Sequence, residues 1–172
     1  MNREKIDAPR WKPVRKEVAM YSLVSVLFVG QVILCFLSYN TDGLTWLSYF
    51  GWITLVVSLV LGMVSRRTFE KKGGAPDKKD WLRTTVVVKT GIYRIVRHPM
   101  YLSFMLTSAA LLFISQHWLS ILFGIPVIAF LYYTMAAEEK INIKEFGNDY
   151  IQYMQKVPRM NFVRGLIQRK KD

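Results

Sequence analysis

Three long stretches of the chain lack any Asp, Glu, Lys or Arg, and this feature restricts the possible folds more than any other. The stretches cover residues 18–39, 44–64 and 100–137, which are 22, 21 and 38 residues long. A helix needs about 20 apolar residues to cross the roughly 30 Å of a bilayer's hydrocarbon core. The longest stretch therefore accommodates two helices, joined by a tight turn near Gln116 and His117. The sequence predicts an all-α polytopic membrane protein with about four transmembrane helices in two hairpins.

A soluble fold and a signal peptide both fit these apolar stretches less well. A soluble helical bundle would have to bury three such stretches within 172 residues. A cleaved signal peptide has an apolar core of about 7–15 residues followed by a small-residue cleavage site, and the first stretch has neither property. The single cysteine, Cys35, lies inside the first stretch and predicts no disulfide framework.

Positive charge is confined to one side of the predicted membrane. Of the 24 Lys and Arg residues, six precede residue 18, ten lie in residues 66–97 and eight follow residue 139, whereas the two short connections contain none. Because Lys and Arg are enriched in cytoplasmic loops, we expect both termini and the 66–97 segment on the cytoplasmic face. The membrane would be the plasma or inner membrane in a prokaryote and the endoplasmic reticulum in a eukaryote. The net charge of +12 then needs no nucleic-acid partner, and it favours contact with anionic membrane lipids.

The segments outside the apolar stretches have their own character. We expect one membrane domain, residues 1–172, with an N-terminal helical hairpin in residues 1–65 and a core in residues 66–172. Residues 1–17 predict a basic amphipathic lead-in, with Trp11 as an anchor at the membrane interface.

Three further segments complete this organisation. The sequence KKGGAPDKKD, residues 71–80, predicts a flexible loop, and TTVVVKTG, residues 84–91, favours an extended conformation because it is β-branched and ends in glycine. Beyond Glu138, apolar residues recur at helical spacing and predict a C-terminal interfacial helix, which Gly147 and Asn148 interrupt. The residues at this spacing are Ile143, Phe146, Tyr150 and Met154.

Polar residues concentrate where the third and fourth predicted helices return to the same membrane face. In GIYRIVRHPMYLSF, residues 91–104, a cluster that includes His98 lies directly before an apolar run, and the proline suits the first turn of a helix. Glu138 and Glu139 end the fourth predicted helix, where the helix dipole disfavours anions, so they need a cationic partner. Arg94, Arg97, Lys140 or a bound cationic ligand could supply the charge. A belt of salt bridges at the lipid headgroups accounts for each charge taken alone. The combination predicts a functional site.

Two motifs in this region resemble a known family. GIYRIVRHPMY is similar to the Gly-x-Tyr-x-x-x-Arg-His-Pro-x-Tyr motif of the isoprenylcysteine carboxyl methyltransferases, which are related to phospholipid N-methyltransferases. The resemblance continues in EEKINIKEFGNDYIQYMQKVPR and covers about residues 86–159. It implies an integral membrane methyltransferase that uses S-adenosylmethionine, releases S-adenosylhomocysteine and modifies a lipophilic acceptor. The acceptor could be prenylcysteine-like, a lipid amine or another membrane-soluble molecule.

The resemblance also implies roles for individual residues and makes residues 66–172 the cofactor-binding core. Cofactor contacts fall on Thr85, Val86, Val87, Val88, Tyr93, His98, Tyr101 and Glu138. Beyond the resemblance, we expect catalytic roles for Arg97 and Glu139 and substrate contacts from Thr134 and Met135, and no metal site is expected. In the prenylcysteine enzymes an arginine stands four residues before the cofactor-binding glutamate and binds the substrate carboxylate. Thr134 occupies that position here, so this contact is not carried over.

The sequence also leaves two different function classes open. Membrane sterol reductases resemble the C-terminal core and its Arg-His motif, but they use NADPH and have more membrane spans. A non-catalytic membrane protein of the same fold would bind lipid or a partner. The oligomeric state is not predicted.

Overall fold

The computed structural model of the protein describes residues 15–74 and 85–169, so the predicted Trp11 anchor and most of the predicted 71–80 loop lie outside the described residues. The described chain is helical and contains no β-strand. Its elements are α1 (Arg15–Leu37), α2 (Thr45–Lys72), η2 (Gly91–Arg94), α3 (Pro99–Ser115), α4 (Trp118–Phe146), α5 (Asn148–Lys156) and α6 (Phe162–Arg169). In this part of the chain α1, α2 and α4 are long and apolar enough to cross a membrane, and α3 is a shorter apolar helix. The predicted all-α polytopic membrane architecture is confirmed.

The most extensive helix–helix contact in the described chain is between α2 and α3, and small residues line it. A Cβ atom added to Gly51 would lie 2.7 Å from Ile114 Cγ1, and one added to Gly62 would lie 3.2 Å from Ser103 Oγ. Ser58 Oγ lies 2.9 Å from Thr107 Oγ1 in the same contact. Small side chains let membrane helices approach closely, and hydroxyl groups then bond across the contact.

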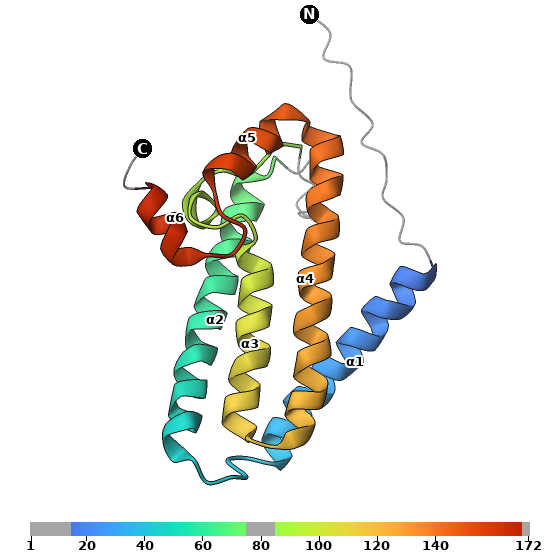
Figure 1. Ribbon diagram of the computed structural model, residues 1–172, viewed down its shortest axis with the longest axis vertical. Coiled ribbons are helices and arrows are strands. Elements are labelled where there is room, and N and C mark those ends of the chain that lie inside the picture. Colours follow the sequence, from blue (N-terminus) through green and yellow to red (C-terminus); the bar gives the residue numbers. More distant parts are fainter. Residues whose placement is uncertain (1–14, 75–84, 170–172) are drawn as a thin grey trace, which may run out of the picture.

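The helix α1 packs chiefly against α4 and α3, although a short connection joins it to α2. Figure 1 shows α1 tilted relative to the other long helices. Gln31 of α1 is fully buried, donates from Nε2 to Ser108 O at 2.8 Å and accepts from Ser108 Oγ at 2.8 Å. Gly124 of α4 leaves room for this amide, since an added Cβ would lie 2.8 Å from Gln31 Nε2. Satisfied polar pairs of this kind hold helices together in lipid, where the hydrophobic effect does not.

The predicted turn between α3 and α4 is confirmed. Gln116 adopts a left-handed conformation with φ of 53°, and α4 begins at Trp118. Residues 85–90 are not helical, as predicted. The predicted start of the interfacial helix at Glu138 is wrong, because α4 continues through it to Phe146 before Gly147, with φ of 56°, breaks the chain.

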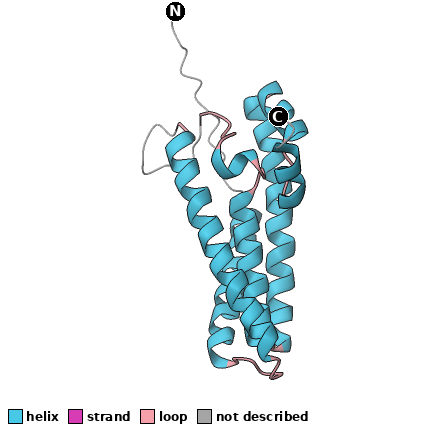
Figure 2. Ribbon diagram, turned by 90° about the vertical axis from the view of Figure 1, so that its left-hand side faces the viewer, coloured by secondary structure: helices cyan, strands magenta, loops and turns pink. Residues whose placement is uncertain are grey.

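One end of the bundle carries the irregular and amphipathic segments. Residues 85–98, α5, the link at residues 157–161 and α6 gather near the C-terminal end of α4 (Figures 1 and 2). We call this the charged end, and we call the end with the connections at residues 38–44 and 116–117 the neutral end. A small apolar cluster secures α5, with Tyr150, Tyr153 and Val157 buried at its centre.

Candidate functional site

The start of α3 is fixed by contacts that reach both α2 and the C-terminal link. Gly91 has φ of 61° and lies close to Thr68 of α2, where an added Cβ would be 3.1 Å from Cγ2. The backbone N–H of Arg97 donates to Pro158 O at 3.0 Å, and that of His98 donates to Arg159 O at 3.3 Å. The polar residues before α3 are therefore held against the link between α5 and α6.

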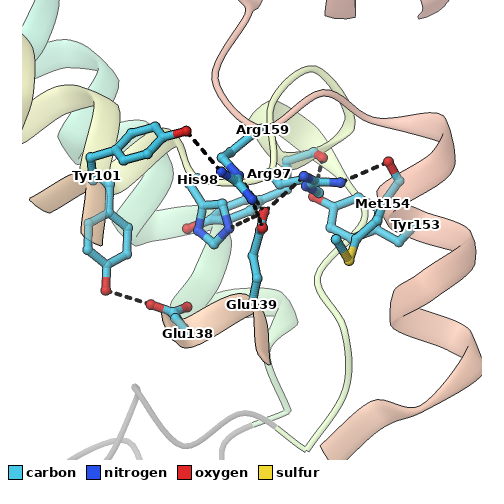
Figure 3. A network of polar contacts seen from close by, with 10 residues as sticks. Arg97, His98, Tyr101, Glu138, Glu139, Tyr153, Met154 and Arg159 are labelled. Atoms are coloured by element: carbon cyan, nitrogen blue, oxygen red, sulfur yellow. Dashed lines mark hydrogen bonds and ion pairs between the residues drawn. The ribbon is translucent and has the colours of Figure 1, made fainter. Parts of the chain in front are cut away.

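The buried carboxylate of Glu139 is the centre of a charged network (Figure 3). Its Oε1 accepts from Arg97 Nη2 at 2.9 Å and from Arg159 Nε at 3.1 Å, and lies 3.2 Å from His98 Nε2. Arg159 Nη2 donates to the other oxygen, Oε2. The Glu139 side chain is 3% exposed, that of Arg97 8% and that of Arg159 34%. Two guanidinium groups and an imidazole thus share one carboxylate.

The two arginines extend this network to neighbouring elements. Arg97 Nη1 donates to Met154 O at 2.8 Å, which joins the start of α3 to α5. Arg159 Nη1 donates to Tyr132 Oη at 3.1 Å, and its guanidinium lies 5.7 Å from the Tyr132 ring centroid, within the range of a cation–π contact. Hydrogen bonding to Glu139 raises the pKa of Arg159, so its charge is permanent. Protein donors already use both oxygens of Glu139, so this network mainly holds the start of α3, α4 and the C-terminal link together. We call Arg97, Glu139 and Arg159 the arginine clamp.

Glu138 has a different environment, because adjacent helix residues point about 100° apart. Tyr101 Oη donates to Glu138 Oε2 at 2.6 Å, the one hydrogen bond of this carboxylate within the described residues. The Tyr101 ring meets the His98 ring edge-on at a centroid distance of 5.7 Å. Burial, together with the nearby charge of Glu138, raises the pKa of Tyr93, so that phenol stays neutral. Glu138 therefore keeps spare acceptor capacity beside aromatic side chains.

The remaining predicted site residues have other contacts. Thr85 is bound to the end of α2, since its N–H donates to Gly73 O at 3.0 Å and its Oγ1 to Gly74 O at 2.9 Å. Val86 is exposed, Val88 is buried, and Val87 packs against the apolar cluster of α5. Thr134 Oγ1 donates to Phe130 O at 2.9 Å within α4, and Met135 is fully buried. The cofactor and substrate roles of these residues stay predictions.

Sequence reasoning did not assign a role to Arg159 or to Tyr153, which both hold the site together. Tyr153 Oη donates to the backbone oxygen of Tyr93 at 2.6 Å, and burial raises the pKa of Tyr153. Burial likewise raises the pKa of Tyr150 to about 12. Both missed residues lie inside the second motif, EEKINIKEFGNDYIQYMQKVPR, which contains Tyr153 and ends at Arg159.

The residues around Glu138 fit S-adenosylmethionine, the cofactor that the sequence predicts. A carboxylate with free acceptor positions suits an ammonium group or ribose hydroxyls, and a nearby tyrosine ring suits a sulfonium through a cation–π contact. The spare capacity of Glu138 beside Tyr101 is therefore of the required chemistry.

Comparison with known proteins gives one family. The family model described as phospholipid methyltransferase matches residues 46–149. The match extends from the start of α2 to the start of α5, so it begins about 40 residues before the segment recognised from the motifs. No curated protein and no solved structure matches the chain.

Proposed function

Because the chain belongs to the phospholipid methyltransferase family, we propose that it transfers a methyl group from S-adenosylmethionine to a lipophilic acceptor. The bound cofactor supplies an activated methyl group on a sulfonium. The observation that supports a site at the charged end is the contrast between the two adjacent glutamates. Both oxygens of Glu139 are used by Arg97, Arg159 and His98, whereas Glu138 accepts a single hydrogen bond, from Tyr101, within the described residues.

The residues of this chain then have two kinds of role. Glu138, Tyr93 and Tyr101 bind the methyl donor, and the non-helical residues 85–88 contribute backbone groups. Arg97 and Glu139, predicted as catalytic, hold the start of α3 and the C-terminal link in place, and His98 connects this clamp to Tyr101. Methyl transfer from a sulfonium needs mainly positioning of the two reactants and exclusion of water, so such a clamp contributes directly to the rate.

The acceptor that suits this site has a neutral or amine head and reaches it sideways from the bilayer. Thr134 offers no positive charge, and its hydroxyl is already bound to Phe130 O. Burying an unpaired carboxylate is costly, which disfavours prenylcysteine as the acceptor. An amine acceptor must lose its proton before it attacks the methyl carbon.

We place the charged end on the cytoplasmic side, because all 24 Lys and Arg residues belong to it in a four-span topology. The test uses single cysteines at Asp42 and Lys71, both exposed, in a Cys35→Ser background. An impermeant maleimide added to intact bacterial cells that carry the protein in their inner membrane should label the Asp42→Cys variant alone. Labelling of both positions from one side would contradict the topology.

Calorimetric titration with S-adenosylhomocysteine tests the proposed function. Glu138→Gln should weaken binding by about 1–3 kcal/mol, the usual cost of removing a charged hydrogen-bond partner. Glu145→Gln, a substitution on an exposed residue of the same helix, is the matched control and should bind like the wild type. Binding of NADPH in place of S-adenosylhomocysteine would favour a reductase. Binding of neither, with no methyl transfer to membrane lipids, would favour a non-catalytic protein.

A further inference from the structure

A cavity of about 450 Å³ lies on the far side of the arginine clamp, at the charged end. Its polar lining comes from the clamp, from the link between α5 and α6, and from α6 itself. The polar residues of this lining include Arg97, Arg159, Asn161, Arg164 and Gln168. None of the predicted cofactor-binding residues lines this cavity.

The charge around this cavity is unbalanced. Three arginines line it and no acidic side chain does. Arg97 and Arg159 already share Glu139, and within the described residues no carboxylate pairs with Arg164. Among the side chains that the structure describes, two buried polar atoms lack a hydrogen-bond partner, the donor Arg97 Nε and the acceptor Gln168 Oε1, and both residues belong to the lining. The unpaired donor suits an anion, whereas the amide of Gln168 would have to present its N–H group. The cavity therefore has the cationic lining of an anion site, with one unpaired buried donor.

The helix α6, which contributes to this cavity, has one packed side and one exposed apolar side. Gly165 is pressed against the residues before α3, where an added Cβ would lie 1.9 Å from Ile95 O. The opposite side of α6 exposes Val163, Leu166 and Ile167. In a membrane protein a short amphipathic helix with an exposed apolar face lies in the interface, with that face in the acyl region. Arg164 and Gln168 then lie at the depth of lipid headgroups.

We propose that this cavity binds the phosphate group of an acidic membrane lipid, at a site separate from the methyl donor. A guanidinium presents a planar fork of N–H groups that matches phosphate oxygens. Three arginines line the cavity and only the single carboxylate of Glu139 pairs with two of them, so the remaining positive charge favours an anion over a zwitterion. The exposed apolar face of α6 favours a lipid over a soluble phosphate, because the acyl chains can lie along that face. The bound lipid would hold α6 and the 157–161 link against the bundle.

The test is calorimetric titration of the full-length protein in detergent with dioctanoyl phosphatidylglycerol, dioctanoyl phosphatidylcholine and inorganic phosphate. We expect the acidic lipid to bind at one site, and Arg164→Gln to weaken it about tenfold, the effect of losing one charge-assisted contact. Arg169→Gln is the matched control, because it removes an exposed cation of the same helix that does not line the cavity. It should change the affinity less than about twofold.

The remaining titrations identify the class of ligand and the site at which it binds. Phosphatidylcholine and inorganic phosphate should each bind at least about tenfold more weakly than the acidic lipid, and saturating S-adenosylhomocysteine should not displace it. Equal affinity of Arg164→Gln and Arg169→Gln for the acidic lipid would overturn the site. Inorganic phosphate binding as tightly as the lipid would overturn the lipid assignment, and displacement by S-adenosylhomocysteine would overturn the separation from the methyl-donor site. Unchanged thermal unfolding of Arg164→Gln without ligand would show that a lost affinity is not lost folding.

Discussion

Polar contacts hold the helices together at both ends of the bundle. The neutral end uses uncharged amide, hydroxyl and backbone groups, whereas the charged end uses ion pairs. At the neutral end the amide of Gln116 makes the main contacts: Nε2 donates to Leu44 O at 2.9 Å and to Ser48 Oγ at 2.8 Å, and Oε1 accepts from Leu44 N at 3.1 Å. At the charged end the corresponding role belongs to Glu139 and two arginines. The neutral end joins α3 to the start of α2, and the charged end joins α3 and α4 to the C-terminal segment.

The two ends differ in how many of their hydrogen-bond donors and acceptors lack a partner. The amide of Gln116 is used at both its nitrogen and its oxygen by backbone and hydroxyl groups. At the charged end Glu138 keeps free acceptor positions, and Arg97 Nε is buried without a partner. A buried donor without a partner, such as Arg97 Nε, is costly in a structure that only has to fold, so it points to a ligand. We infer that the neutral end stabilises the bundle and the charged end performs the function.

The largest expected effect is at the centre of the clamp. Glu139→Leu leaves two guanidinium groups without their carboxylate and should reduce the free energy of unfolding by about 3–5 kcal/mol. Denaturant unfolding in mixed micelles measures it, with Glu145→Leu as the control on the exposed face of the same helix. A loss below about 1 kcal/mol would mean that this network behaves like an exposed salt bridge.

An intermediate effect is expected at the neutral end. Gln116→Ala removes an amide that bonds to the backbone of Leu44 and to the buried hydroxyl of Ser48, so it should cost about 1–3 kcal/mol of stability. Its affinity for S-adenosylhomocysteine, measured under conditions where the variant is folded, should equal that of the wild type. Weakened binding in the folded variant would remove the functional distinction between the two ends.

A smaller effect is expected from Tyr153→Phe, which removes the hydrogen bond to Tyr93 O and should cost about 1 kcal/mol. The pH dependence has a definite sign. Burial raises the pKa of Tyr153 in the folded state, so its contribution is complete below the ordinary tyrosine pKa of about 10 and declines as the pH rises further. The stability of the wild type should therefore fall more steeply above pH 10 than that of Tyr153→Phe. Parallel curves would show that the hydroxyl is not buried.

Much of the fold follows from local sequence properties. Uncharged stretches predict the long helices, Pro99 predicts the start of α3, and the turn before Trp118 and the break at Gly147 are where the sequence expects them. The packing of α1 against α4 does not follow, because apolar surfaces of similar length do not specify a partner. That choice depends on Gln31 meeting Ser108 beside Gly124, a match between distant residues.

The sequence predicts which segments form the candidate site. It does not predict which side chains within those segments contact one another. The two motifs locate the start of α3 and the pair Glu138 and Glu139 at one end of the bundle. Which glutamate meets the arginines depends on the rotation of α4, since adjacent residues differ by about 100°. The helix α6 was not expected, because its eight residues are too short for a clear periodic signal.

The division of roles between Glu138 and Glu139 is tested most directly by an experimental structure of the full-length protein with S-adenosylhomocysteine bound, in a membrane mimetic that contains phosphatidylglycerol. We predict that the nucleoside or amino-acid part of the ligand contacts Glu138, with Tyr93 or Tyr101 beside the sulfur, while Glu139 keeps its bonds to Arg97 and Arg159. Density for the ligand in the cavity beside Arg164, with Glu138 left bound to Tyr101 alone, would contradict this division.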